Sequence, residues 1–157
     1  MKKHLYRTTV NWAGNTGSGT SSYRAYGRNH TIRGTNKATT IEGSSDPHFR
    51  GEGARYNPEE LLIGSLSACH MLSYLHLCAV NDVVVLDYAD EAEGEMEEAE
   101  DGSGRMTRVI LRPRVTITAA SDSGRAQSLH DEARRLCFIA NSINFAVMHE
   151  PSVQLAS

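Results

Sequence analysis

Two cysteines of this chain stand where their thiols could carry out redox chemistry. Cys69 lies in the middle of a long segment of apolar and small residues, and Cys137 lies near the end of a second segment with helical spacing. Only a thiolate attacks a peroxide or a disulfide, and a free thiol has a pKa near ~8.5. Cysteine is also among the residue types most often buried, so both could instead be small core residues. If the two segments pack against each other, the two thiols could meet.

A carboxylate and an arginine are the groups that would activate such a thiol. Glu59 precedes Cys69 by ten residues, which is about 15 Å along a straight helix at ~1.5 Å per residue. Glu59 therefore lies outside the helix or serves a cysteine of a neighbouring chain, unless it only favours the helix dipole. Arg50 and Arg28 are the candidate cations, because a guanidinium gripped by a carboxylate can direct another N–H at sulfur. Without such a role, each arginine is a solvated surface residue.

The elements that must position these residues begin with strands. Alternating residues over 4–12, a second segment over 22–32 and a third over 39–42 predict an N-terminal meander. Asn57, Pro58 and Glu60 then form a capping-box helix start. No residue from 61 to 79 breaks a helix, and nearly all are apolar or small, which predicts an internal helix carrying Cys69.

The second half of the chain predicts more strands and another helix. Residues 83–97 and 106–118 read as an antiparallel pair whose glutamates and arginines face each other, so these charges are expected to pair locally rather than bind a basic partner. They are Glu91, Glu93, Glu95, Glu97, Arg108, Arg112 and Arg114. A helix over 124–140 carries Cys137, and a strand over 152–155 closes the chain. This order predicts a single α+β domain over residues 1–157.

The composition restricts the class of protein. A chain of 157 residues with 39% hydrophobic and 22% charged residues is typical of one globular domain. A net charge of -3 and a pI near 6.1 give no reason to expect nucleic acid or an anionic membrane as partner. No signal peptide is recognisable and no window approaches the roughly 18 apolar residues of a membrane span, so we expect a cytoplasmic protein. Three cysteines are too few for a disulfide-stapled secreted fold.

Three motifs resemble those of one known family. Asn57-Pro58-Glu59-Glu60-Leu61-Leu62 and Ser67-Ala68-Cys69-His70 resemble segments of the OsmC/Ohr family of hydroperoxide reductases. Ala133-Arg134-Arg135-Leu136-Cys137 resembles the segment that holds the resolving cysteine of that family. The resemblance implies an OsmC-like fold, with two long central helices packed with antiparallel sheets. It also implies an intertwined homodimer with active sites at the interface, and it implies no cofactor.

The resemblance also implies roles for individual residues. Cys69 corresponds to the peroxidatic cysteine, Cys137 to the resolving cysteine, and Glu59 to the carboxylate that acts with an arginine. One branch of the family keeps that arginine in the first glycine-rich turn, where this chain has Asn15. The other branch has it shortly before the Asn-Pro-Glu start, where this chain offers Arg50, which is therefore the arginine we assign.

The implied activity is a thiol-dependent, peroxiredoxin-like reduction of an organic hydroperoxide to an alcohol. It passes through a Cys69 sulfenic acid and a Cys69–Cys137 disulfide. A dithiol then reduces the disulfide, and in this family that dithiol is often a lipoyl group, so a lipoylated protein is the implied partner. The apolar surface around Cys69 favours alkyl or fatty-acid hydroperoxides. Phe138 stands where family members commonly have proline, a departure that bears on the substrate.

Two other interpretations stay open. A metal site would have to be assembled from residues without paired Cys-x-x-Cys or His-Glu-x-x-His spacing. Its possible ligands are Cys69, His70, His76, Cys78, Cys137 and His149. A non-catalytic, stress-associated binding or structural dimer of the same fold would keep both cysteines in the core, since a fold does not guarantee its chemistry. Thiol reactivity toward a hydroperoxide distinguishes these interpretations from a peroxidase.

Overall fold

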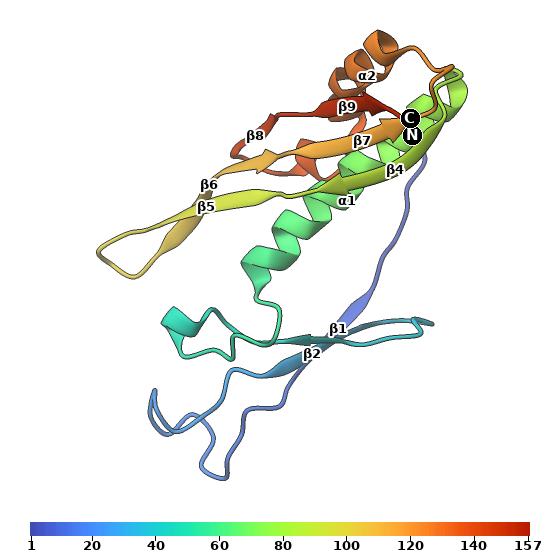
Figure 1. Cartoon of the computed structure of the whole chain (residues 1–157). Helices are drawn as coiled ribbons and strands as arrows, with labels where there is room; N and C mark the ends of the chain where they lie inside the picture. The colour runs from blue at the N-terminus through green and yellow to red at the C-terminus, as the bar shows by residue number, and fades with distance from the viewer. The chain divides into compact units, whose positions relative to one another are not determined.

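The N-terminal part of the chain folds around one small sheet. The computed structural model describes residues 1–157, which form two compact units, 1–61 and 62–157. In the first unit, three strands pair antiparallel in the order β1-β2-β3 (Figure 1). They are β1 (Thr8–Trp12), β2 (His30–Gly34) and β3 (Ile41–Gly43), followed by a short 3-10 helix, η1 (Pro47–Phe49). The predicted meander is confirmed, whereas the single-domain expectation stays a prediction.

The second strand begins later than predicted because residues 22–29 contain a tight loop built around Arg28. The Arg28 guanidinium donates hydrogen bonds to the backbone carbonyls of Tyr23 and Tyr26. It also lies 4.4 Å and 4.0 Å from the centroids of the two tyrosine rings, which is within cation–π range. These carbonyls are therefore satisfied within the loop instead of in a strand ladder.

Helix α1 (Pro58–Val80) starts where the sequence predicted. The Asn57 side chain accepts a hydrogen bond from the Glu60 N–H at 2.8 Å, and the Glu60 carboxylate accepts one from the Asn57 N–H at 3.0 Å. This reciprocal pair confirms the predicted capping box. The helix ends at Val80, and Asp82 then takes a left-handed φ of 58° as the chain turns toward the next strand.

The second unit contains two three-stranded sheets (Figure 1). Their strands, in chain order, are β4 (Val85–Asp90), β5 (Glu93–Glu98), β6 (Gly104–Leu111), β7 (Pro113–Ile117), β8 (Ala146–His149) and β9 (Ser152–Leu155). The sheet orders are β4-β7-β9 and β5-β6-β8. The β4–β7 and β5–β6 pairings are antiparallel, as predicted, whereas β8 and β9 join in parallel, so the sheets are mixed.

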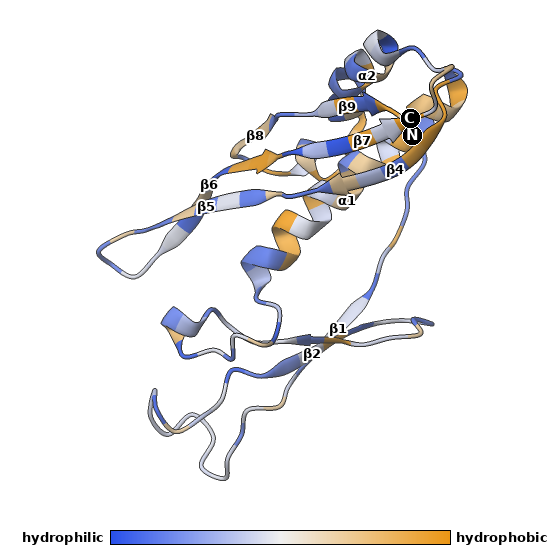
Figure 2. Cartoon of the chain, viewed as in Figure 1, coloured by the Kyte–Doolittle hydropathy of each residue, from blue (hydrophilic) through white to orange (hydrophobic).

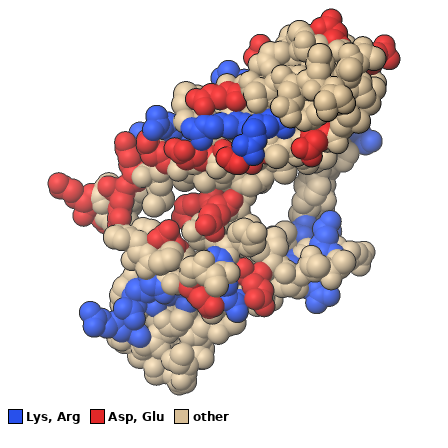
Figure 3. All heavy atoms as spheres, in the orientation of Figure 1, with Lys and Arg blue, Asp and Glu red and all other residues tan.

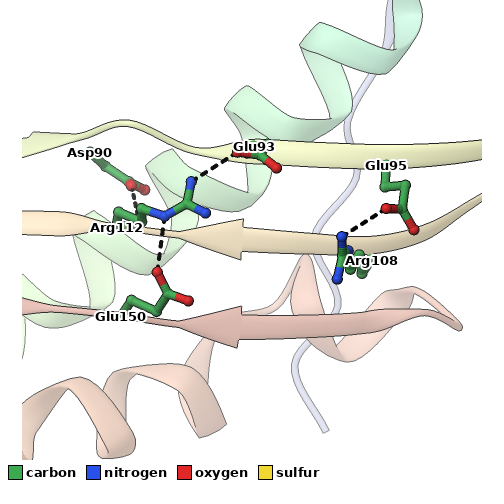
Figure 4. Close-up of polar contacts among 6 residues, drawn as sticks. All are labelled: Asp90, Glu93, Glu95, Arg108, Arg112 and Glu150. Atoms are coloured by element: carbon green, nitrogen blue, oxygen red, sulfur yellow. Dashed lines mark hydrogen bonds and ion pairs between the residues drawn. The ribbon is translucent and has the colours of Figure 1, made fainter.

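Charged side chains cross the junction between the two sheets. The Arg112 guanidinium donates to Glu93 at 3.2 Å and to Glu150 at 2.9 Å, while the Arg112 N–H donates to the Asp90 carboxylate at 2.6 Å (Figure 4). Ion pairs also join Arg108 to Glu95 and Arg114 to Glu91. Figure 3 shows the resulting row of basic groups with acidic groups along both sides. The expectation that these charges pair locally is confirmed.

Helix α2 (Ser123–Leu136) is shorter than the predicted span of 124–140. It begins with a cap in which the Asp122 carboxylate accepts from the Arg125 N–H at 3.0 Å. It ends at Leu136 because Cys137 takes extended backbone angles and the chain enters a 3-10 turn, η2 (Ala140–Ser142). The Asn141 side chain donates to the Arg135 carbonyl at 3.0 Å, which satisfies one of the free carbonyls of the last helical turn. Strand β8, which follows, was not predicted from the sequence.

The core of the second unit joins both helices to the strands. One cluster combines residues of α1, α2 and β7, namely Tyr74, Leu77, Cys78, Ala126, Leu129, Ala133, Val115 and Ile117, with Val83. A second cluster packs Leu66 of α1 against strands β6 and β8. Figure 2 shows apolar residues recurring along α1 and on β6. The predicted α+β class is confirmed, whereas α1 buries only one face in the single chain, through Leu66, His70, Tyr74, Leu77 and Cys78, instead of the fully internal helix that was predicted.

The length and composition of α1 correct one sequence-based expectation. An 18-residue window of this helix has a mean hydropathy of 1.4, so the helix is long and apolar enough to cross a membrane. The expectation that no window approaches this limit was wrong. Core helices also reach this hydropathy, and α1 buries two polar rings, His70 and Tyr74, inside the second unit. These contacts are typical of a core helix.

Candidate active site

The structure brings the thiols of Cys69 and Cys137 together. Cys69 lies in the middle of α1, and Cys137 terminates α2 at its C-terminal end. The two thiols share a side-chain hydrogen bond, and all three cysteines of the chain are free thiols. The packing of the two helices therefore places a second sulfur beside Cys69, while the catalytic roles of both cysteines stay a prediction.

The two thiols have different environments. Cys137 is 1% exposed, and its Sγ accepts a hydrogen bond from the Ala140 N–H at 3.4 Å. Burial raises the pKa of the Cys137 thiol to about 11, and the hydrogen bond with Cys69 adds to that rise. Cys69 is only partly buried. At neutral pH Cys137 is therefore a protonated, enclosed thiol, and Cys69 is the sulfur that a small molecule can reach.

An apolar cavity of about 620 Å³ opens beside Cys69. One wall is a face of α1, and the other is the end of α2 with the residue after Cys137. The lining residues are Ser65, Ala68, Cys69, Leu72, Ser73, His76, Leu136 and Phe138. Leu72 is 64% exposed and Phe138 is 80% exposed, so the cavity rim presents large apolar side chains. The volume is typical of sites that hold small organic ligands.

The predicted carboxylate and arginine belong to the first unit, whereas both cysteines belong to the second. Glu59 lies in the first turn of α1, so the alternative that it stands outside the helix is excluded, and about 15 Å of helix separates it from Cys69. Arg50 is exposed and has a left-handed φ of 65°, where its N–H closes η1 on the Pro47 carbonyl at 3.0 Å. Arg28 is held in the loop of residues 22–29, the tyrosine loop, by its hydrogen bonds to the Tyr23 and Tyr26 carbonyls. Of the two candidate arginines, Arg50 has the guanidinium that makes fewer contacts.

The remaining candidate ligands do not form a metal site. Cys78 is buried and shares a hydrogen bond with the Tyr74 hydroxyl, and burial raises its thiol pKa, as expected of a core cysteine. His76 lies on the cavity wall. No group of three or more His, Cys, Asp or Glu side chains is arranged to hold a metal ion.

Two features of this region were not predicted from the sequence. The first is the contribution of Leu136 and Phe138 to the cavity, which depends on where α2 ends. The second is a cluster of His70 and His130, both buried, with His149, which is partly buried. The signal for His130 was its helical spacing from Cys137, seven residues away on the buried face of α2.

Comparisons with known proteins agree on one fold. A family model described as "OsmC-like protein" matches residues 51–151. The uncharacterized protein YmaD of Bacillus subtilis (strain 168) is 26% identical over 162 residues, which is 99% of this chain and 98% of YmaD. An OsmC-like protein of unknown function from Vibrio cholerae is 29% identical, with a TM-score of 0.86 over 96% of this chain and 100% of its own. The organic hydroperoxide resistance protein OhrB of Bacillus subtilis has a TM-score of 0.61 at 17% identity, over 96% of this chain and 98% of its own.

Proposed function

The chain belongs to the OsmC-like family, and we propose that it is a cysteine-dependent peroxidase that reduces organic hydroperoxides to alcohols. The observation that carries the proposal is the unequal thiol pair. Cys69 lines an apolar cavity, and Cys137 is a buried thiol within hydrogen-bonding distance of it. A peroxidase that closes a disulfide needs this division between an accessible sulfur and an enclosed one.

The first step oxidises Cys69. Its thiolate attacks the terminal oxygen of the hydroperoxide, a sulfur–oxygen bond forms, and the oxygen–oxygen bond breaks. The alkoxide takes up a proton and leaves as the alcohol, and Cys69 becomes a sulfenic acid. The apolar walls provided by Leu72 and Phe138 favour a hydroperoxide with a hydrocarbon body over hydrogen peroxide.

The second step uses the buried thiol. Cys137 attacks the sulfur of the Cys69 sulfenic acid, a disulfide forms, and the oxygen leaves as water. The raised pKa of Cys137 keeps this thiol protonated until the sulfenic acid is present, which limits its competing oxidation. An external dithiol, for which a lipoylated protein is our candidate, then restores both thiols through a mixed disulfide. We place this cycle in the cytoplasm, where such reductants are available.

Glu59 and Arg50 complete the site in a homodimer. Within α1, Glu59 is too far from Cys69 to act on the thiol of its own helix. A second copy of the chain would supply both groups to that thiol, with the carboxylate holding the guanidinium against the sulfur. The large apolar side chains exposed in the second unit, among them Leu72, Leu86 and Phe138, support an interface there, because such side chains on a soluble protein commonly mark contact surfaces.

The test is anaerobic titration of the reduced protein with cumene hydroperoxide, followed by intact mass and non-reducing peptide mapping. We expect one Cys69–Cys137 disulfide per chain after one equivalent. The Cys137→Ser variant should instead accumulate a Cys69 sulfenic acid that a dimedone reagent traps, and the Cys78→Ala variant should behave as the unmodified protein. Unchanged thiols, or oxidation that bypasses Cys69, would leave a non-catalytic dimer of this fold as the function.

A further inference from the structure

Three histidines meet inside the second unit, two of them on the helices that carry the thiol pair. His70 comes from α1, His130 from α2 and His149 from the end of β8. His70 Nε2 and His130 Nδ1 are 3.1 Å apart and share a hydrogen bond, and the His70 and His149 ring centroids are 4.5 Å apart. His70 and His130 are 0% and 2% exposed. The hydrogen bond between these two rings links the two helices that carry the cysteines.

The surroundings of the cluster favour the neutral form of each imidazole ring. The outward nitrogens, His70 Nδ1, His130 Nε2 and His149 Nδ1, are buried without a hydrogen-bond partner. Burial, with the neighbouring imidazoles, lowers the pKa of His70 to about 3, and burial lowers that of His130 to about 4. A proton on one ring would add a buried charge whose outward N–H has no hydrogen-bond partner, and protons on both rings would leave two donors facing each other.

The groups around the cluster compensate such a charge only in part, because burial outweighs the nearby carboxylates. From α1, the Tyr74 ring stacks on His130 at 3.8 Å and its hydroxyl donates to the Ala126 carbonyl. From α2, Arg134 opposes protonation of His149, whereas Asp131, which is exposed, favours protonation of His149 and of His130, and Asp90 of β4 also favours that of His149. From β4, the Asp90 carboxylate accepts from Ser67 and from the Arg112 N–H, and the Tyr88 hydroxyl is buried without a partner. The nearest fully buried neighbours are therefore neutral rings.

The positions of the histidines connect them to the two sulfurs. His70 follows Cys69 in α1. His130, Ala133 and Cys137 lie at i, i+3 and i+7 of α2 and are all buried, so they share the face that packs on α1. A change in the distance between His70 and His130 therefore changes the distance between Cys69 and Cys137.

We propose that His70 and His130 are positioning residues that hold Cys137 beside Cys69 while both imidazoles are neutral, and that their protonation releases Cys137 and slows disulfide closure. This role rests on the proposed function, because closure is its second step. At about pH 5, the protonated form of an imidazole with an ordinary pKa near ~6.5 exceeds the neutral form about 30-fold. Each histidine that becomes accessible when the helices separate therefore shifts the equilibrium toward separation by about that factor.

The test follows closure without any peroxide. Dithiodipyridine reacts with Cys69 to give a mixed disulfide and one thiopyridone. Cys137 then attacks the Cys69 sulfur, the Cys69–Cys137 disulfide forms, and a second thiopyridone leaves. The rate of the second release measures closure, with peptide mapping to verify the bond. The proteins are the full chain, His130→Asn, whose amide can replace the Nδ1 hydrogen bond, and His130→Ala, which removes it. His4→Asn, at an exposed site, is the matched control.

We expect the closure rate of the unmodified chain, divided by that of His130→Asn, to fall at least tenfold between about pH 7.5 and about pH 5. The thiolate fraction of Cys137 cancels in this ratio. His130→Ala should close at least tenfold more slowly than His130→Asn at neutral pH, and His4→Asn should match the unmodified chain throughout. A ratio that does not change with pH overturns the proposal. Normal closure in this assay without any reaction with hydroperoxide would instead overturn only the peroxidase function.

Discussion

Acidification should destabilise this protein through its buried histidines. The perturbation is a shift from about pH 7.5 to about pH 5. The folded-state pKa values of His70 and His130, about 3 and about 4, lie below the value of 6.5 expected in the unfolded chain. The unfolded chain therefore binds protons in this interval and the folded chain does not, so stability present above pH 6.5 is lost as the pH falls.

The magnitude follows from the two proton-binding equilibria. At about pH 5, protonation of the unfolded chain contributes about 2 kcal/mol for each of the two histidines, or about 4 kcal/mol in total. This loss is a large part of the 5–15 kcal/mol that typically stabilises a folded domain. A midpoint of urea unfolding should therefore move to a clearly lower urea concentration at the lower pH.

The assay is urea unfolding followed by far-ultraviolet circular dichroism, which reports on α1 and α2. Carboxylates also titrate, so the comparison is with the double variant His70→Gln/His130→Asn, whose amides keep hydrogen-bonding groups in the cluster but bind no proton. The free energy of unfolding of the unmodified chain should fall by about 4 kcal/mol more than that of the variant between the two pH values. Equal losses in the two proteins would refute the assignment of neutral, proton-excluding histidines.

Three further predictions concern the active site and the helix start. Leu72→Asp should convert the proposed dimer to a monomer in light scattering, because a carboxylate would be buried at an apolar contact; a dimer of unchanged stability would place the interface elsewhere. Arg50→Ala should lower the rate of Cys69 oxidation by cumene hydroperoxide at least tenfold, whereas Arg28→Ala should mainly loosen the tyrosine loop, and the reverse order would reassign the activating arginine. Asn57→Ala should cost about 1 kcal/mol in urea unfolding through loss of its cap, and no change would show that the cap is redundant.

Local signals in the sequence were sufficient for the elements whose cause is local. The capping box of Asn57 and Glu60 and the facing charges of β5 and β6 follow from spacing alone, and both are present. Strand β8 was missed because Ala146, Val147 and Met148 show no alternation of polar and apolar residues, whereas the equally short β9 alternates and was predicted. The end of α2 was misplaced because a tertiary requirement, the turn that buries Cys137, overrides a sequence that contains no helix breaker.

The candidate site shows the same division between local and distant causes. Cys69 and Cys137 could be selected by type and context, and the contact between them required only that two apolar helices pack. The histidine cluster could not be selected, because each histidine alone is unremarkable in sequence and the three come from three elements. The spacing of His130 from Cys137 becomes informative only once the buried face of α2 is known.

Consecutive residues of α1 serve different sides of the helix. Side chains at successive helical positions point about 100° apart, so Cys69 reaches the cavity while His70 is fully buried among the other histidines. Substitutions on the cavity face therefore change which molecules reach the sulfur, and substitutions on the buried face change where the second sulfur lies. Because these faces can be altered one at a time, a defect in the first oxidation and a defect in disulfide closure should separate between Leu72 and His70 variants. A single face carrying both functions would make every variant slow both steps together.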